Sequence, residues 1–440
     1  MSKQIKAGER GAVRVLLALL LCVWLVGSGT VHAQVAGTPP SAVNPRSASI
    51  TAATEEVLRE TSEVRKLAVL HPVKSGAQSR AEIERMLIQN LDEESKPAEI
   101  RASELALKKL GLVPAAFQLR PFIIKLLTEQ VMGYYDPRTK IFYLADWVNL
   151  DEQQPVMAHE LTHALQDQHF DLRRFEHWPK GDSDAELAAH ALVEGDAMVS
   201  MSFYVMRDLK RAVAMMKSAS GGGSTEQIDR APRALRESLL FPYEQGMMWV
   251  QQLYKRGGWP QVSQAFTALP QSTEQVLHVD KYFAHEAPIK MNVPDLAKAL
   301  GKGWQRIDYD VNGEWNYYQL LVEYLPTTEE AERAAAGWGG DRYAVYEQGQ
   351  TGRVCLAQVT SWDTAQDARE FYDAYAKRTA RRYNVAAPDV RTDKQASAQS
   401  VWHTNEGAVV VQLQGTHVLI LEGLPDKASI SKLLEMLAPQ

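Results

Sequence analysis

The spacing of hydrophobic residues predicts two differently built parts of the chain. Over residues 54–266, apolar side chains recur at intervals of three and four, which is typical of amphipathic helices. After residue 285, short runs of alternating or continuous apolar residues are typical of strands, and two helical stretches interrupt them. We therefore predict an α+β protein. A mainly helical domain with a small β-hairpin or sheet spans 51–284, and a smaller α+β domain with a core of its own spans 285–440.

Local signals predict several element ends in the helical part. Ser79 and Glu82 have the spacing of a capping box that opens a helix. The next predicted helix spans 97–110 and is stopped by Gly111. Two β-rich runs around a turn sequence predict a hairpin over 131–144.

The centre of the chain predicts long helices. One covers 151–170, and another starts at Ser183. A run rich in Gly and Ser predicts a flexible loop over 218–225. Helices are expected to resume over 231–266, with breaks at Pro242 and at residues 257–260.

The first 33 residues predict a secretory signal peptide. A basic segment precedes the apolar run 15–27, and residues 31–33 fit a cleavage site after small residues. An uncleaved membrane anchor is the alternative, but 13 apolar residues fall short of the roughly 20 needed to span a bilayer. Residues 34–50 are rich in Pro, Ser and Ala, which predicts a disordered linker. We expect a periplasmic or secreted protein without stable membrane insertion after cleavage.

Composition excludes several classes of function. The 48 Lys and Arg against 54 Asp and Glu give a net charge of −6, so the chain lacks the basic excess of nucleic-acid binders. Only 2 Cys are present, and one lies in the predicted signal peptide, which excludes a disulfide scaffold. A serine or cysteine hydrolase is not favoured, because no GxSxG sequence occurs and Cys355 lies in a strand-like run.

The strongest motif is an HExxH sequence inside the predicted helix 151–170. His159 and His163 are four residues apart, so both imidazoles lie on one face of a helix and can bind one metal ion. Glu160 projects about 100° around the helix. It can therefore reach water on that ion without ligating it, which is the position of a general base.

A catalytic zinc needs a third protein ligand. His169 has the spacing of the metzincin pattern, but Gln166 occupies the position where that pattern needs a Gly to break the helix. Glu194 is the better candidate, because its helix is apolar nearly all round and a buried carboxylate needs a partner. Gly195 indicates close backbone approach there. His190, four residues before Glu194, stays a minor candidate.

These residues resemble the gluzincins, zinc metallopeptidases with an HExxH helix and a Glu ligand on a second helix. Over about 129–197 the chain also resembles a group of exported, metallopeptidase-like proteins. The resemblance implies a zincin-like fold and a Zn²⁺ ion with three ligands: His159, His163 and Glu194. It also implies Glu160 as catalytic base, and it suggests the hairpin 131–144 as the edge strand that pairs with the substrate backbone.

One departure from the gluzincin pattern leaves two roles open. Thermolysin-like members carry an Asp four residues after the ligand Glu, and Met198 stands at that position here. The acceptor that orients a zinc histidine is then Asp196 or Asp167. A side chain that stabilises the oxyanion is also expected, and three rings are candidates: Tyr243, His278 and Tyr282.

The sequence thus predicts an exported zinc endopeptidase with a peptide or protein substrate. The alternative is a non-catalytic envelope protein that keeps zinc for structure and binds proteins or polymers through its C-terminal domain. Glu160 favours the enzyme, because a structural site needs no base. No metal-ligand spacing occurs in 285–440, so no side chain from that part is expected at the metal.

Overall fold

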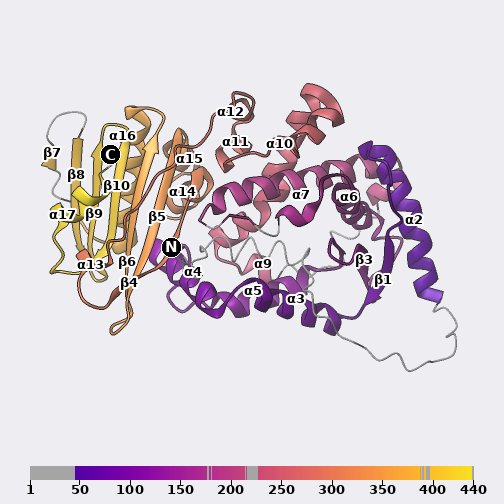
Figure 1. Cartoon of the computed structure of the whole chain (residues 1–440), viewed down its shortest axis with the longest axis horizontal. Coiled ribbons are helices and arrows are strands. Elements are labelled where there is room, and N and C mark those ends of the chain that lie inside the picture. Colours follow the sequence, from indigo (N-terminus) through magenta and orange to yellow (C-terminus); the bar gives the residue numbers. More distant parts are fainter. Residues whose placement is uncertain are drawn as a thin grey trace, which may run out of the picture.

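The computed structural model describes residues 45–438 except 176–177, 180, 214, 216–225, 387, 389–390 and 393–396. The chain has the predicted α+β architecture, with a helical region beside a separate antiparallel sheet (Figure 1). The predicted signal peptide, the first part of the predicted linker and the predicted loop 218–225 lie outside the described residues. Within them, no helix combines the length and the apolar character that crossing a membrane requires.

The helical region begins earlier than predicted. Helix α2 covers Pro45–Arg65, so the prediction of disorder is wrong for residues 45–50. Composition misled here because the ordering comes from tertiary contacts. Ile50 is 2% exposed within the hydrophobic core, and the Arg46 guanidinium donates a hydrogen bond to the Val148 carbonyl.

The remaining helices of this region include those predicted from Ser79, over 97–110, over 151–170, from Ser183 and over 231–266, together with others that were not predicted. They are α3 (Arg80–Glu94), α4 (Pro97–Leu110), α5 (Leu119–Gln130), α6 (Gln154–Phe170), α7 (Ser183–Met206), α9 (Glu226–Asp229), α10 (Arg233–Ala265), α11 (Thr273–Leu277) and α12 (Val279–Phe283). The capping box at Ser79 is present, and Gly111 ends α4 in the left-handed conformation. The predicted break at Pro242 is wrong, because α10 continues through this buried residue. The predicted break at 257–260 is confirmed by the non-helical backbone of Gly257 and Gly258.

A three-stranded sheet lies beside α6. The predicted hairpin forms β2 (Gly133–Asp136) and β3 (Ile141–Ala145), and β1 (Lys74–Gln78) pairs in parallel with β3 on its other side. The sequence of β1 shows no strand-like alternation, which is why it was not predicted.

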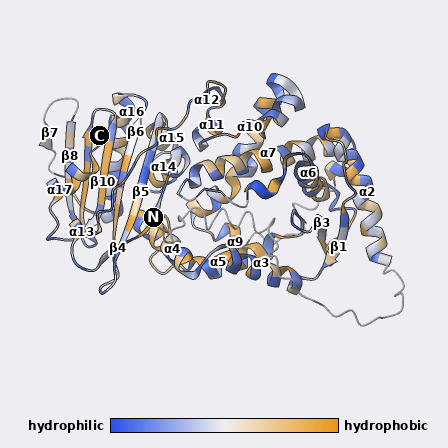
Figure 2. Ribbon diagram, viewed as in Figure 1, coloured by the Kyte–Doolittle hydropathy of each residue, from blue (hydrophilic) through white to orange (hydrophobic). Residues whose placement is uncertain are grey.

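The C-terminal sheet has seven strands in the order β4-β5-β6-β10-β9-β8-β7, all paired antiparallel. Their bounds are β4 (Trp304–Asp310), β5 (Trp338–Gln348), β6 (Arg353–Trp362), β7 (Arg391–Thr392), β8 (Ser397–Thr404), β9 (Gly407–Gln414) and β10 (His417–Leu424). Hydrophobic residues concentrate on its central strands (Figure 2). Because antiparallel strands need only short turns, most of these connections are local.

Helices cover both faces of this sheet. One face carries α14 (Gly313–Val322), α15 (Thr328–Ala335) and α16 (Ala365–Tyr383), whereas α13 (Ala297–Leu300) and α17 (Ile430–Leu437) cover the other. Val418 and Ile420 on β10 belong to a core that continues into the helical region, and Leu419 and Leu421 belong to the outer core. The prediction of an independent C-terminal core is therefore wrong for the inner face of the sheet.

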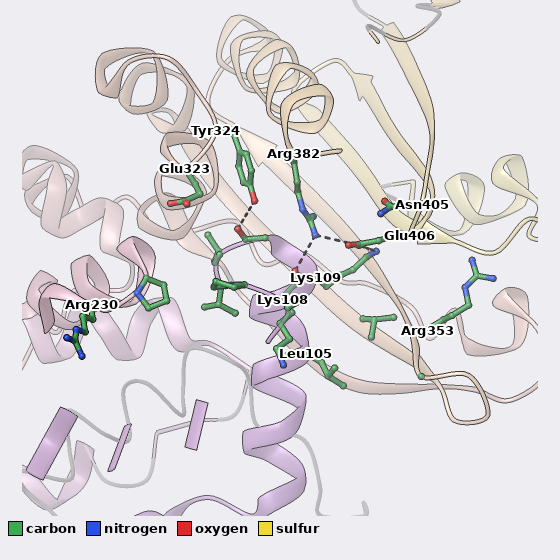
Figure 3. A pocket seen from close by; sticks show the side chains of 18 residues that line it. Leu105, Lys108, Lys109, Arg230, Glu323, Tyr324, Arg353, Arg382, Asn405 and Glu406 are labelled. Atoms are coloured by element: carbon green, nitrogen blue, oxygen red, sulfur yellow. Dashed lines mark hydrogen bonds and ion pairs between the residues drawn. The ribbon is translucent and has the colours of Figure 1, made fainter. Parts of the chain in front are cut away.

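Helix α4 is attached to the C-terminal sheet by hydrogen bonds, although α4 ends about 190 residues before the first strand of that sheet begins (Figure 3). The Arg378 guanidinium donates to the Leu110 carbonyl, and Arg382 donates to the Lys108 carbonyl at 3.3 Å. Both arginines also bind Glu422, which is fully buried on β10. Cations at the negative end of a helix satisfy its free carbonyls. Helix α4 therefore packs on the C-terminal sheet, although it precedes the predicted domain boundary at residue 285 in the sequence.

Candidate metal centre

Helices α6 and α7 bring three predicted ligands together. His159 Nε2 lies 3.1 Å from His163 Nε2 and 3.1 Å from Glu194 Oε2, and His163 Nε2 lies 3.5 Å from the same oxygen. All three side chains are buried, and among the described residues this group has three members. The helical spacing of the motif and the buried face of α7 thus produce the predicted convergence.

The two alternative ligands lie outside this group. His169 is at the end of α6, and its Nε2 contacts the Ala68 carbonyl at 2.8 Å. Because α6 is not broken at Gln166, its axis carries His169 away from the motif, as expected. His190 is buried on α7, and neither ring nitrogen has a hydrogen-bond partner among the described residues. Burial lowers the pKa of His190 to about 4, so its ring is neutral at neutral pH.

The donor geometry fits a tetrahedral zinc ion. Zinc bonds of about 2.0–2.1 Å to imidazole nitrogen place neighbouring ligand atoms about 3.3 Å apart in a tetrahedron. The three separations of 3.1, 3.1 and 3.5 Å bracket that value. Two imidazoles and one carboxylate also match the ligand set of catalytic zinc sites, which leaves the fourth position open.

The electrostatics of the group favour a carboxylate beside imidazoles. Burial alone would raise the pKa of Glu194, but His163 and His159 outweigh it and hold that pKa well below its ordinary value. Burial opposes a charged His159, yet its contact with Glu194 raises the pKa of the ring. Glu194 is therefore ionised and can serve as a metal ligand.

A buried chain of hydrogen bonds orients His163. Its Nδ1 lies 2.9 Å from Gln166 Oε1, and because an amide oxygen only accepts, Nδ1 carries the proton and Nε2 offers its lone pair to the centre. Gln166 Nε2 donates to Asp196 Oδ2 at 2.9 Å and to the Val193 carbonyl at 3.0 Å. Arg65 Nε donates to the other Asp196 oxygen at 2.5 Å.

Gln166 was not predicted as the partner of a zinc histidine. Asp196 was one of the two predicted partners. It does not contact His163 directly but accepts a hydrogen bond from Gln166, which contacts His163. The only sequence signal was that Gln166 replaces a Gly in the metzincin pattern. The participation of Arg65 on α2 depends on packing across 131 residues, for which the sequence carries no local signal.

Asp167, the other predicted acceptor for a histidine of the motif, does not have that role. Its Oδ2 accepts hydrogen bonds from the Tyr135 hydroxyl at 2.8 Å and from Lys140 at 2.5 Å, while Oδ1 accepts from the Leu172 amide. Tyr135 and Lys140 come from the hairpin of β2 and β3. Asp167 therefore fastens the hairpin to α6 and does not contact the histidines.

Glu160 lies beside the candidate metal-binding group of His159, His163 and Glu194 without belonging to it. It is 6% exposed, and its Oε2 accepts a hydrogen bond from the Tyr135 backbone amide at 3.1 Å. Burial raises the pKa of Glu160; His159 and His163 lower it, and Glu194 raises it further. A carboxyl group with a raised pKa is suited to accept and return a proton near neutral pH.

Of the three candidate rings, only Tyr243 lies at the centre. Its ring stacks on His159 with centroids 6.1 Å apart, and its hydroxyl is close enough to the Glu194 carboxylate to interact with it. Burial, reinforced by Glu194 and Glu160, keeps the pKa of Tyr243 well above its ordinary value, so the phenol is a hydrogen-bond donor. His278 instead binds Glu314, and the Tyr282 hydroxyl donates to the Ala268 carbonyl.

Two glycines position Tyr243 over the ligands. An added Cβ at Gly195 on α7 would lie 2.3 Å from the Gly246 carbonyl, and one at Gly246 on α10 would lie 2.3 Å from the Ala191 carbonyl. The two helices therefore touch backbone to backbone, as predicted from Gly195. Tyr243 is about one turn before Gly246, so this contact places its ring beside Glu194.

A second group of carboxylates already has a cation at its centre. Glu274, Glu286 and Asp363 lie within 4.8 Å of one another, and each binds Lys281 Nζ at 2.6–2.7 Å. This lysine ties α11 and α12 to the turn after β6. The group is therefore an ion-pair junction between the two regions.

Comparison with known families reaches only the C-terminal sheet. Residues 300–434 match a family model described as a domain of unknown function, DUF8575. No curated protein and no solved structure matches the chain. The matched residues run from the end of α13 into α17 and contain none of the residues of the metal-binding group.

Proposed function

We propose that this chain is an exported zinc-dependent endopeptidase. One observation carries the proposal: two imidazole nitrogens and a carboxylate oxygen lie at the spacing of tetrahedral zinc ligands, with an unligating glutamate directly beside them. The gluzincin-like order of these residues in the sequence supports it. His159, His163 and Glu194 would hold the zinc ion.

The roles of the side chains follow from their positions. A zinc ion held here would supply a Lewis acid that polarises the scissile carbonyl and lowers the pKa of attacking water. Glu160 takes the proton from that water and returns it to the leaving amine. The Tyr243 hydroxyl donates a hydrogen bond to the oxygen that becomes negative. Gln166 holds His163 in the tautomer that offers Nε2 to the metal.

Strand β2 gives the base its orientation. The Tyr135 amide on β2 fixes one oxygen of Glu160, and Asp167 ties the same strand to α6. In the three-stranded sheet β2 pairs only with β3, so it is an edge strand. The resemblance to gluzincins assigns such an edge to the backbone of the substrate, which supports a peptide or protein substrate.

The predicted signal peptide supports action in the periplasm or outside the cell. The alternative function, a zinc-stabilised envelope protein without activity, leaves the position of Glu160 unexplained. A structural site also commonly has four protein ligands. The described residues supply three to this group.

Replacement of the base tests the proposal. Glu160→Gln should bind one zinc ion per chain like the wild type, because no ligand is lost, while hydrolysis of a fluorogenic peptide library falls about 10²–10⁴-fold. Glu152→Gln, just before α6, is the matched control and should keep its activity. Full activity of Glu160→Gln would contradict the mechanism, and a wild-type protein that binds zinc but cleaves no peptide would favour the alternative.

A further inference from the structure

A pocket of about 690 Å³ lies between the helical region and the C-terminal sheet. Helix α10 forms one wall, α14 and α15 form the opposite wall, and the end of α11 closes one side. Its two main walls thus come from different parts of the chain: α10 carries Tyr243, and the other two helices lie within the matched family of unknown function.

Aromatic rings form the inner surface of this pocket. The rings of Phe241 and Trp315 have centroids 4.7 Å apart, and those of Trp315 and Tyr318 are 5.2 Å apart. Trp315 is held by its indole N–H, which donates to Ser238 at 3.3 Å. Such a set of ring faces attracts a cation that carries an apolar stem.

The pocket is lined by more acidic side chains than basic ones. Four glutamates line the pocket against one arginine and one histidine: Glu237, Glu244, Glu314, Glu332, Arg333 and His278. Arg333 already pairs with Glu370 at 3.5 Å, and Glu237 binds Arg233 and Gln319. Glu244 and Glu332 are exposed and have no ion-pair partner among the described residues.

Glu314 has a carboxylate oxygen that lacks a hydrogen-bond donor among the described residues, which is a separate observation in favour of a ligand. It is 5% exposed, and its Oε1 binds His278 Nε2 at 2.8 Å. Its Oε2 is buried and has no hydrogen-bond partner within the described part of the chain. A buried carboxylate oxygen without a donor is costly, so a ligand N–H group in this pocket would relieve that cost.

The cleft beside α4 does not have this character (Figure 3). It is about 900 Å³ in volume, but four of its five cationic residues pair with carboxylates of the protein. These pairs are Lys108 with Glu104, Lys109 with Glu406, Arg230 with Glu226, and Arg382 with Glu422. The charges of that cleft are paired within the protein, whereas the pocket beside α10 keeps two glutamates without an ion-pair partner among the described residues near the partly exposed ring of Tyr318.

We propose that the pocket between α10, α14 and α15 binds the side chain of an arginine or lysine in a polypeptide. The alkyl stem packs on Tyr318 and on the part of Trp315 that lines the pocket, and the cationic head meets the glutamates. That this polypeptide is a substrate rests on the proposed function; the binding itself does not.

The position of the pocket on α10 suits an accessory binding site. Glu237, Leu240, Phe241 and Glu244 are spaced by three and four residues, so they share one face of α10. Tyr243 and Gly246 lie on the face that meets α7 and the metal-binding group. The helix therefore separates the two sites, and a basic residue bound here is distant from the scissile bond in the substrate sequence.

Direct binding tests the inference without relying on hydrolysis. Isothermal titration of the full mature chain carrying Glu160→Gln would use the blocked pentapeptide Gly-Gly-Arg-Gly-Gly and the same peptide with neutral citrulline in place of Arg. We expect the arginine peptide to bind at least about fivefold more tightly. The double variant Glu244→Gln/Glu332→Gln should remove this difference, and the control Glu329→Gln, an exposed residue of α15 outside the pocket, should keep it.

Each other outcome is decisive. Equal affinity of the two peptides, no detectable binding of either, or a preference that survives in the double variant would overturn the inference. Tighter binding of free arginine than of the pentapeptide would assign the pocket to a small organic cation instead. A preference for arginine in a protein that binds no zinc would refute the proposed peptidase and leave the pocket intact.

Discussion

Two buried glutamates, one in each region, have opposite surroundings. Glu422 on β10 is held by Arg378 and Arg382, and these cations outweigh burial and lower its pKa to about 2. Glu194 on α7 also has a lowered pKa, but its neighbours are the ring nitrogens of two histidines.

This difference separates a buried carboxylate that is paired with cations from one that lies among atoms able to bind a metal ion. Around Glu422, guanidinium groups and a tyrosine hydroxyl hydrogen-bond to the carboxylate, and the arginines also donate to carbonyls of α4, so the charge of Glu422 is paired within the protein. Around Glu194, the ring nitrogens meet at one point, and hydrogen bonds behind His163 hold that arrangement. Burial of a charge is therefore a weak sign of function, whereas convergence of metal-binding atoms is a strong one.

The largest expected effect is on metal binding. Glu194→Gln should weaken zinc affinity at least about a thousandfold, because one of three protein ligands is lost. Competition with a chromophoric chelator measures this. His169→Ala is the matched control, since this histidine lies on the same α6 but outside the group, and it should bind zinc like the wild type. Zinc loss in the control instead would restore the metzincin-like assignment.

The corresponding change in the sheet should act on stability. Glu422→Gln leaves two buried arginines without their carboxylate and should cost about 3–5 kcal/mol in urea unfolding. The folded pKa of Glu422 is lowered, so its contribution is present above the unfolded pKa of about 4.5 and is lost as pH falls toward about 2. Between those limits the wild type should lose more stability than the variant. Equal pH profiles of the wild type and the variant would show that the charge of Glu422 does not stabilise the attachment of α4 to the sheet.

A smaller effect is expected behind the metal ligands. Gln166→Leu removes the acceptor of the His163 proton and should weaken zinc affinity about 10–100-fold, with a normal circular dichroism spectrum. Gln166→Glu keeps an acceptor and should recover most of that affinity. Gln168→Ala serves as control, because Gln168 lies on the same helix as Gln166 but hydrogen-bonds to the backbone of residues 70 and 71. If Gln166→Leu binds zinc like the wild type, the hydrogen-bond chain is only structural.

The site could be predicted from sequence where its geometry is local. A four-residue spacing on a helix determines that His159 and His163 converge, and the apolar surroundings of Glu194 indicated its burial. The choice of Tyr243 over two other rings, and the role of Gln166, depend on how α7 and α10 meet. Contacts between distant helices have no pattern within either segment, so the sequence left these roles open.

The fold shows the same limit. The capping box of α3, the end of α4 at Gly111 and the hairpin of β2 and β3 were predicted, because their signals lie within a few residues. Strand β1 was missed because its order comes from pairing with β3, and the start of α2 was missed because its order comes from buried contacts such as that of Ile50. The attachment of α4 to the sheet involves arginines more than 250 residues away, and no local signal encodes it.

X-ray absorption at the zinc edge of the purified mature chain tests the central claim most directly. With one zinc ion bound per chain, the spectrum should show two imidazole nitrogens and light oxygen ligands at about 2.0–2.2 Å. In Glu194→Gln the oxygen shell should change or the metal should be lost, and in Glu160→Gln the two imidazoles should remain. A chain that binds no stoichiometric zinc, or a spectrum with three or more imidazoles, would contradict the assignment of His159, His163 and Glu194.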